Sequence, residues 1–283
     1  METPKIDLCF LKSYETFFSA LKDLGLSSNQ IKKHITNKKL LEAKISSRQL
    51  TSISLDIINN GLISPIYSGP LPKILFENDF VVGIDKPAGI HCHPLCYSDQ
   101  GNLLSWLRQN SFKYLDVNVN SYDRGLINRI DFETSGVVLY SKCGELLKEI
   151  RENFEGIITR KIYYAKVSGD ASHIKGDYSF HLRPFGPGKK KVVCVETEAP
   201  NTFTTILDVD CNSVNDFSIV KITIKSGYRH QIRVVMSELG FPIIGDVLYG
   251  GLVSDRLYLH SYNYQIKLGG KSIEISSPLP KDF

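Results

Sequence analysis

Apolar residues recur at helical spacing near the start of the chain. Between residues 14 and 25 they fall on one helix face at every third or fourth position: Phe17, Phe18, Leu21 and Leu24. A second helix is predicted from Ser27 to about Ile35, because Ser27 and Gln30 have the Ser-x-x-Gln spacing of a capping box. A β-like stretch from about Ile53 to Ile63 completes a small N-terminal domain of helices and strands.

Farther along, the two-residue period of strands dominates the pattern. Residues 68–72, Ser-Gly-Pro-Leu-Pro, punctuate the chain and predict a boundary between domains at 1–70 and 71–283. Strands outnumber helices after this boundary and are joined by short turns as well as by helices. We therefore expect an α+β domain with flanking helices around a mixed, mostly antiparallel sheet. Its clearest elements are strands at 74–76, 80–84, 160–167 and 221–225, and helices at 146–154 and 230–239.

Composition places the chain among ordinary globular proteins. Hydrophobic residues make up 42% and charged residues 23% of the 283 positions. Neither a membrane-length apolar run nor a secretory signal is recognisable, so a cytoplasmic location is expected. The six cysteines lack a regular spacing, which favours reduced thiols over a disulfide framework.

Positive charge is concentrated in the N-terminal domain. The chain carries a formal charge of +4, whereas the segment from Lys22 to Arg48 alone has seven basic and two acidic residues. Four lysines are predicted on the outer face of the second helix: Lys32, Lys33, Lys38 and Lys39. Such a cluster suits a polyanion, although for any single cluster a solvated face is the favoured interpretation.

The stretch with the most chemical content surrounds Asp131. This carboxylate follows Arg129 by two residues, and the turn Thr134-Ser135-Gly136 leads from it into the apolar run 137–140. A carboxylate held in such a loop can be a nucleophile, a general base or a metal ligand, or can cap the turn. The residues by themselves favour the structural interpretation.

Histidines and cysteines between His91 and Cys96 raise the question of a zinc site, since imidazole and thiolate are the ligands that zinc prefers. The alternating positions suit a strand, and no second ligand pair stands at finger-like spacing. We therefore expect no metal there.

Three ordered stretches of this sequence resemble one known family. Residues 128–136 resemble the signature H-R-L-D-x-x-T-S-G of the RluA-type pseudouridine synthases. Residues 161–169 resemble that family's K-x-Y-x-A-x-V-x-G strand. Residues 227–233, continued by 245–250, resemble its G-R-x-H-Q-I-R and G-D-x-x-Y-G block. Three motifs in the same order are far more specific than any one of them.

The resemblance covers roughly residues 75 to 275, with weaker agreement at 85–89 and 259–261. It implies the pseudouridine synthase fold and an isomerase that converts uridine to pseudouridine in ribosomal RNA, or alternatively transfer RNA. The reaction breaks the C1′–N1 bond, turns the base and joins C5 to C1′, so it requires no cofactor, metal or redox step. The first 70 residues loosely resemble the RNA-binding motif of ribosomal small-subunit protein four.

Catalytic roles follow from the same resemblance. Asp131 corresponds to the catalytic carboxylate, which either attacks C1′ or removes a sugar proton. Arg233 corresponds to the arginine that keeps this carboxylate ionised and oriented. Tyr163 corresponds to the tyrosine that stacks on the uracil and is a candidate for assisting proton removal from C5.

Other residues are expected to bind the substrate. Arg129 corresponds to an arginine that fills the space of the flipped-out uridine. Further candidates are Asn128, Thr134, Arg229, His230 and Gln231, of which His230 and Gln231 are expected to support the catalytic residues. The sequence departs from the family pattern at Asn128, Ile130 and Tyr228, where His, Leu and Arg are commoner. Tyr228 removes a cation near the site, which affects substrate contacts more than chemistry.

Three alternatives compete with the synthase. A non-catalytic RNA-binding or ribosome-assembly factor on the same fold would tolerate loss of the catalytic residues, but this sequence retains Asp131, Tyr163 and Arg233. A glycosylase would admit water and leave an abasic ribose and free uracil. A metal-dependent nuclease is the weakest alternative, because no cluster of acids accompanies Asp131.

Overall fold

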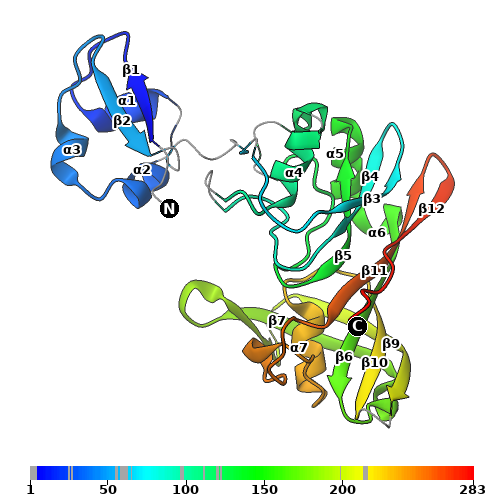
Figure 1. Cartoon of the computed structure of the whole chain (residues 1–283). Helices are drawn as coiled ribbons and strands as arrows, with labels where there is room; N and C mark the ends of the chain where they lie inside the picture. The colour runs from blue at the N-terminus through cyan, green and yellow to red at the C-terminus, as the bar shows by residue number, and fades with distance from the viewer. Residues whose placement is uncertain are drawn as a thin grey trace. The chain divides into compact units, whose positions relative to one another are not determined.

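The computed structural model describes residues 5–24, 26, 28–54, 57, 63–64, 66–95, 99–110, 112–118, 121, 123–197, 199–212 and 216–283 (Figure 1). The chain forms two compact units. The first comprises residues 1–68 and 93–124, and the second comprises residues 69–92 and 125–283. The boundary predicted at residue 70 lies beside the first change of unit, and the segment 93–124 groups with the N-terminal residues.

The first unit contains a two-stranded antiparallel sheet and several short helices. They are β1 (Lys5–Cys9), α1 (Phe17–Asp23), α2 (Ser28–His34), α3 (Lys38–Glu42), β2 (Leu50–Ser54), α4 (Leu103–Asn110) and η2 (Phe112–Asp116). Phe17 and Leu21 of α1 are completely buried, as the apolar spacing predicts. Leu24 is 52% exposed, because the helix ends one residue before it.

Helix α1 begins with a capping box that was not predicted from the sequence. The Thr16 hydroxyl accepts a hydrogen bond from the Ser19 amide, and the Thr16 amide donates to the Ser19 hydroxyl. The capping box predicted at Ser27 lies outside the described residues. So does most of the predicted β stretch beyond Ser54, where β2 ends.

The four lysines do not share one helix, which corrects the sequence-based expectation. Lys32 and Lys33 belong to α2, whereas Lys38 and Lys39 open α3. Asn37 separates the two helices by capping α3, where its Oδ1 accepts the Leu40 amide at 3.3 Å. All four side chains are exposed.

A ten-stranded sheet forms the described part of the second unit. Its order is β3-β4-β5-β11-β6-β10-β9-β7-β8, with β12 paired to β11 (Figure 1). Only β5 and β11 pair in parallel; the other described pairs are antiparallel. This arrangement confirms the predicted α+β fold with a mixed, mostly antiparallel sheet. The strands are β3 (Lys73–Glu77), β4 (Val81–Lys86), β5 (Ser135–Ser141), β6 (Ile158–Ser168), β7 (Gly176–Phe185), β8 (Lys191–Val195), β9 (Asn201–Asn212), β10 (Phe217–Ile224), β11 (Leu259–Leu268) and β12 (Lys271–Ser276).

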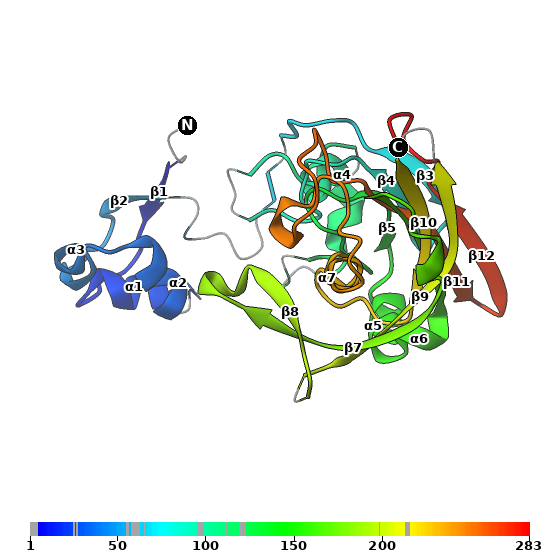
Figure 2. The same cartoon turned by 90° about the horizontal axis from the view of Figure 1, so that it is seen from below.

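Helices accompany the sheet at several crossings. They are α5 (Gly144–Glu152), α6 (Phe154–Ile157), η3 (Ser172–Ile174), η4 (Pro187–Lys189), α7 (Gln231–Glu238) and η5 (Val247–Tyr249). Helix α7 lies against strands β7, β8 and β9 (Figure 2). The helix predicted over 146–154 is broken at Asn153, and Gly156 lies inside α6 instead of ending the first helix.

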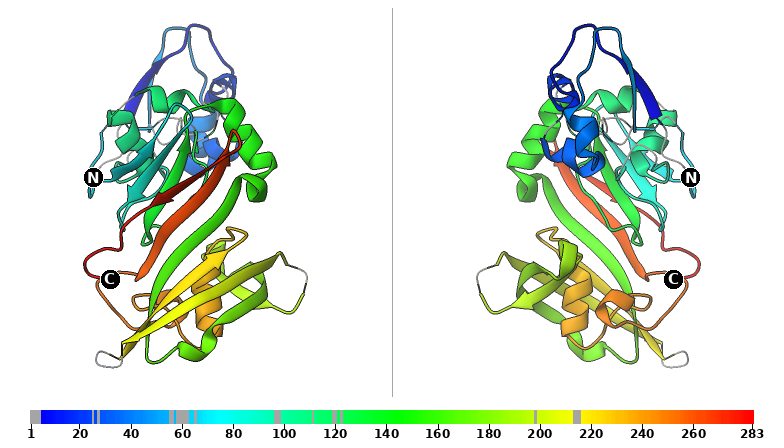
Figure 3. Two further views of the ribbon diagram at one scale, coloured as in Figure 1. Left: turned by 90° about the vertical axis from the view of Figure 1, so that its right-hand side faces the viewer. Right: turned by 90° about the vertical axis from the view of Figure 1, so that its left-hand side faces the viewer.

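The long neighbours β6 and β11 run through the middle of the sheet (Figure 3). Along β6 the side chains alternate as predicted. Tyr163 is 6% exposed and belongs to the main core, whereas the neighbouring Tyr164 is only partly buried. The strand thus presents Tyr163 from a rigid position.

Within the described part of the chain, no helix is both long enough and apolar enough to cross a lipid bilayer.

Candidate functional site

A pocket in the second unit collects residues from three separate parts of the chain. The loop before β5, the middle of β6 and the start of α7 contribute to it. Its lining comprises Arg129, Ile130, Asp131, Thr134, Tyr163, Ile224, Gly227, Tyr228, His230, Gln231, Ile232, Arg233 and Leu259. Seven of the nine residues predicted for catalysis or substrate binding are therefore brought together.

The loop that carries Asp131 is fixed where it leads into β5. Its far end is a turn in which the Thr134 amide donates to the Asp131 carbonyl at 3.1 Å. Gly136 then enters β5 with a φ of 110°, and a Cβ there would collide with the backbone of Ser261 on β11. Glycine is required because the two strands approach too closely for a side chain.

Lys86 holds the same loop in place through hydrogen bonds to backbone carbonyls. Its buried ammonium group donates to the carbonyls of Pro87 at 3.0 Å, Ile90 at 2.9 Å and Phe132 at 3.3 Å. Burial lowers the pKa of Lys86 to about 8. Cys92 adds a second anchor, since its buried sulfur contacts both the amide and the carbonyl of Ile130 at 3.4 Å.

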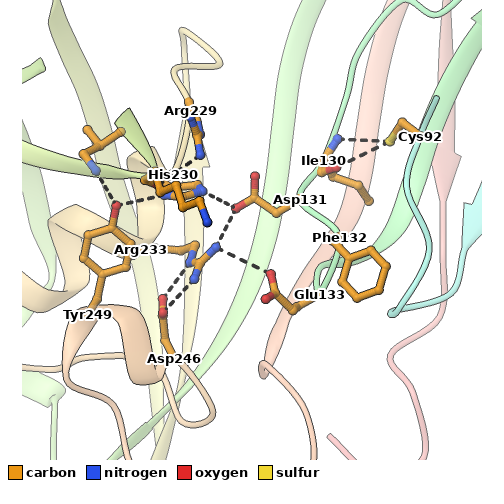
Figure 4. A network of polar contacts seen from close by, with 12 residues as sticks. Cys92, Ile130, Asp131, Phe132, Glu133, Arg229, His230, Arg233, Asp246 and Tyr249 are labelled. Atoms are coloured by element: carbon orange, nitrogen blue, oxygen red, sulfur yellow. Dashed lines mark hydrogen bonds and ion pairs between the residues drawn. The ribbon is translucent and has the colours of Figure 1, made fainter. Parts of the chain in front are cut away.

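Arg233 joins the catalytic candidate to a buried carboxylate. Its Nη1 donates to Asp131 Oδ2 at 3.0 Å, while Nε and Nη2 donate to the two oxygens of Asp246, each at 2.7 Å (Figure 4). Burial opposes the charge of Arg233, but the hydrogen bonds and charge of Asp246, followed by Asp131, raise its pKa above the ordinary value. A fork held on one side by Asp246 therefore presents a permanent cation to Asp131.

His230 approaches the same carboxylate from the N-cap position of α7. Its Nε2 lies 3.7 Å from Asp131 Oδ2, and its Nδ1 lies 2.8 Å from the Tyr249 hydroxyl (Figure 4). Burial lowers the pKa of His230; Asp131 opposes this shift and Arg233 adds to it. His230 is the N-cap residue, directly before the first helical residue Gln231, and it has a left-handed φ of 55°.

Tyr163 forms an inner wall of the pocket through a chain of hydrogen bonds. Its hydroxyl lies 2.7 Å from the hydroxyl of Tyr264, which accepts from Asn128 Nδ2 at 3.1 Å. Burial raises the pKa of Tyr163, and the hydrogen bond with Tyr264 opposes that shift only in part. The neutral phenol is therefore the form that the site favours.

Asn128 and Arg229, both expected to bind the substrate, lie outside the pocket lining. Asn128 accepts the Leu139 amide at 2.7 Å and supports Tyr264 behind Tyr163. Arg229 donates to the carbonyl of Lys190 at 2.9 Å and so ties the start of α7 to the end of the β7–β8 hairpin.

Gln231 and Thr134 line the pocket in different ways. The amide of Gln231 is occupied by protein, donating to the Phe203 carbonyl and Thr204 hydroxyl and accepting from Ser226 and Tyr228. Thr134 is 2% exposed, and its hydroxyl has no hydrogen-bond partner among the described residues. The hydroxyl oxygen is itself buried, so it is an unpaired polar atom within the wall of the pocket.

Asp246, Tyr249, Tyr264 and Lys86 were assigned no role from the sequence. The signal existed for two of them, because Asp246 and Tyr249 stand in the G-D-x-x-Y-G stretch. Lys86 stands in the weaker match at 85–89. Nothing in the local pattern of Tyr264 distinguishes it from an ordinary strand aromatic.

The suspected zinc ligands do not assemble in the described part of the chain. No group of three or more His, Cys, Asp or Glu side chains there could hold a metal ion. Cys92 is engaged with Ile130, and His93 lies 3.5 Å from Asp123. Cys96 lies outside the described residues.

Comparison with curated proteins finds RNA pseudouridine synthases. A ribosomal large subunit pseudouridine synthase D of Borreliella burgdorferi is 29% identical over 217 residues, covering 74% of this chain and 66% of that enzyme. A dual-specificity RNA pseudouridine synthase RluA of Vibrio parahaemolyticus is 29% identical, covering 68% and 76%. An uncharacterized RNA pseudouridine synthase of Helicobacter pylori is 27% identical across 96% of this chain and 94% of its own.

Solved structures support the fold. Human RNA pseudouridylate synthase domain containing 1 matches 74% of this chain and 83% of its own, with a TM-score of 0.57 and 18% identity. Human RNA pseudouridylate synthase domain containing 4 matches 74% and 89%, with a TM-score of 0.55 and 20% identity. Residues 80–238 also match the family described as RNA pseudouridylate synthase. The chain therefore belongs to the RNA pseudouridylate synthase family.

Proposed function

We propose that this protein isomerises specific uridines of ribosomal RNA to pseudouridine, with Asp131 as the catalytic carboxylate. The observation that carries the proposal is the different surroundings of the two carboxylate oxygens of Asp131. One oxygen, Oδ2, is bound by Arg233 inside a pocket, while Oδ1 has no hydrogen-bond partner among the described residues. A carboxylate that is oriented on one side and open on the other is suited to act at C1′ or at a sugar proton.

The pocket also fits a uracil that must be kept while its glycosidic bond is broken. The ring of Tyr163 and the apolar side chains of Ile224 and Leu259 offer faces for a planar base. Retention is essential, because a base that escaped would leave an abasic ribose.

Tyr163 serves this function as a neutral phenol. Burial raises its pKa, so stacking on the uracil and donation of a hydrogen bond suit it better than removal of the C5 proton as a phenolate. Arg129 lines the pocket beside Asp131, a position that suits filling the gap left by the flipped nucleotide.

Ribosomal RNA is the substrate class we favour over transfer RNA. Two considerations support it: the relative from Borreliella burgdorferi is a ribosomal large subunit enzyme, and the first unit carries four exposed lysines. The Vibrio relative named as dual-specificity keeps transfer RNA as the alternative to be measured.

Tritium release from C5-labelled uridine tests the proposal directly. Wild-type protein should release tritium from ribosomal RNA without breaking the chain, whereas Asp131→Asn should lose at least about a thousandfold in rate, because the amide cannot act at the sugar. RNA affinity and melting temperature should change little. The matched control is Glu149→Gln, the same change on the exposed face of α5.

The outcomes separate the alternatives. Appreciable activity in Asp131→Asn contradicts the assignment of this carboxylate. Release of free uracil would identify a glycosylase. Binding without tritium release from naked or assembled ribosomal RNA or from transfer RNA would favour a non-catalytic RNA-binding or assembly factor.

A further inference from the structure

The two oxygens of Asp131 have different surroundings. Arg233 Nη1 lies 3.0 Å and His230 Nε2 lies 3.7 Å from the same oxygen, Oδ2 (Figure 4). Oδ1 accepts no hydrogen bond from the described residues. The role of His230 therefore depends on whether its Nε2 carries a proton and can donate to Oδ2.

Tyr249 decides the proton position on His230. Its hydroxyl oxygen accepts the Val192 amide at 2.9 Å and lies 2.8 Å from His230 Nδ1. Among the described residues, Nδ1 is the only acceptor in range for the phenolic proton. If Tyr249 donates to Nδ1, the proton of the neutral imidazole must reside on Nε2, facing Asp131.

The doubly protonated imidazolium fits this arrangement poorly. Its Nδ1–H would have to donate to the Tyr249 oxygen, which already accepts from Val192 and would then lose the acceptor for its own proton. The side chain of His230 is 8% exposed and lies beside the Arg233 cation. Both surroundings oppose a second positive charge.

The ring of Tyr249 also contacts the other partner of Asp131. The Arg233 guanidinium carbon lies 5.3 Å from the ring centroid, and the His230 ring meets the Tyr249 ring edge-on at 5.6 Å. Tyr249 is 6% exposed, so this position is packed. The left-handed φ of 55° at His230 costs backbone energy, which is consistent with a position kept for its side chain.

We propose that Tyr249 is a positioning residue that fixes His230 as the neutral Nε2–H tautomer, which donates to Oδ2 of Asp131 and leaves Oδ1 as the reactive oxygen. This inference rests on the proposed function of Asp131. The gap of 3.7 Å closes to hydrogen-bond length when substrate fills the pocket, as catalytic hydrogen bonds commonly do. A neutral donor orients the carboxylate without cancelling its charge.

Nitrogen NMR of ¹⁵N-histidine-labelled full-length protein tests the tautomer without requiring activity. The chain has seven histidines, and His230 is assigned by its absence from the spectrum of His230→Asn. At about pH 7.5, His230 should show an unprotonated Nδ1 and a protonated Nε2. The exposed His34 should instead show signals averaged between the two neutral tautomers. In Tyr249→Phe the His230 pattern should shift toward averaging.

A pair of substitutions separates the two ring nitrogens in the tritium-release assay. His230→Gln places an amide donor near the Nε2 position, whereas His230→Asn keeps a group only near Nδ1. Asparagine tolerates the left-handed backbone better, so misfolding would not explain a defect confined to His230→Asn. We expect His230→Asn to lower kcat about tenfold with little change in KM, and His230→Gln to recover most of it.

Each outcome has a distinct meaning. An Nδ1–H or doubly protonated His230 in the wild type would overturn the inference, even in an active enzyme. Equal kcat for His230→Asn and His230→Gln would also overturn it. The expected tautomer in a protein that releases no tritium from any RNA would instead contradict the proposed function and leave the hydrogen-bond assignment intact.

Discussion

Asp246 is the residue on which the electrostatics of the site depend. Its carboxylate is completely buried and accepts two hydrogen bonds of 2.7 Å from Arg233. Together with Tyr249, three residues later, it holds both groups that approach Asp131 Oδ2. The carboxylate expected to react is thus oriented through two residues that lie outside the pocket lining.

Arg233→Lys tests this arrangement at the scale of one side chain. A lysine carries the charge but cannot bind both oxygens of Asp246 and reach Asp131 at once, so we expect kcat to fall about a hundredfold. Leaving Asp246 partly unpaired should also lower the free energy of unfolding by about 3 kcal/mol. Tritium release and urea unfolding measure the two effects.

The control is Arg151→Lys, an exposed position on α5, which should change neither quantity. Wild-type kcat in Arg233→Lys would show that charge alone is sufficient and that the fork geometry is not needed.

At the scale of elements, the Asp131 loop depends on strand β4 for its position. Lys86, the last residue of β4, binds three carbonyls, including that of Phe132 next to Asp131. Helix α7 adds His230 from its N-cap and Arg233 from its first turn. The site is therefore set by where β4, β5 and α7 end or begin.

Lys86→Met provides a pH-dependent test of that anchor. The pKa of Lys86 is lowered from 10.5 to about 8, so between these values the unfolded chain binds a proton that the folded chain has released. Wild-type stability must rise with pH across this window, and the methionine variant lacks this contribution. The unfolding free energy of the wild type minus that of the variant should therefore increase by about 3 kcal/mol from pH 8 to 10.5.

Urea unfolding of both proteins at several pH values measures this difference, in which the titrations of other groups cancel. A difference independent of pH would mean that Lys86 keeps its ordinary pKa and that its burial is offset by other groups.

At the scale of the whole molecule, the exposed lysine cluster belongs to the first unit and the candidate catalytic pocket to the second. Lys32, Lys33, Lys38 and Lys39 are exposed on two consecutive helices of the first unit. Changing all four to glutamine should weaken RNA binding and reduce the slope of log affinity against log salt by up to about 3, because fewer counterions are released.

A second variant serves as its control, with four exposed lysines of the second unit changed to glutamine: Lys148, Lys175, Lys267 and Lys271. Filter binding at several salt concentrations compares the two. If only the control loses affinity, the first unit does not grip RNA and the basic segment is a solvated surface.

Periodicity and motif order were sufficient for much of this protein. The two-residue alternation predicted β6 with Tyr163 and Tyr164 on opposite faces, and the three-to-four spacing predicted α7, because both periods are properties of the local chain. The motifs predicted the family and the contact of Arg233 with Asp131. Local signals failed at helix ends: Asn37 caps a separate helix that begins at Lys38, and Asn153 divides the helix predicted over 146–154.

Only the tertiary structure decided which residues support the catalytic candidates. Asp131 and Arg233 are 102 positions apart, and Tyr163 and Tyr264 are 101 positions apart. No local pattern could therefore predict that Asp246 binds Arg233 in the first pair, or that Asn128 donates to Tyr264 in the second. Asn128, expected from the signature to bind the substrate, makes its described hydrogen bonds to Tyr264 and to the backbone of β5. The sequence by itself determined the family and the candidate catalytic side chains, because motifs are read from local residue identity. Their orientation and protonation depend on burial and on distant partners, which exist only once the sheet has formed.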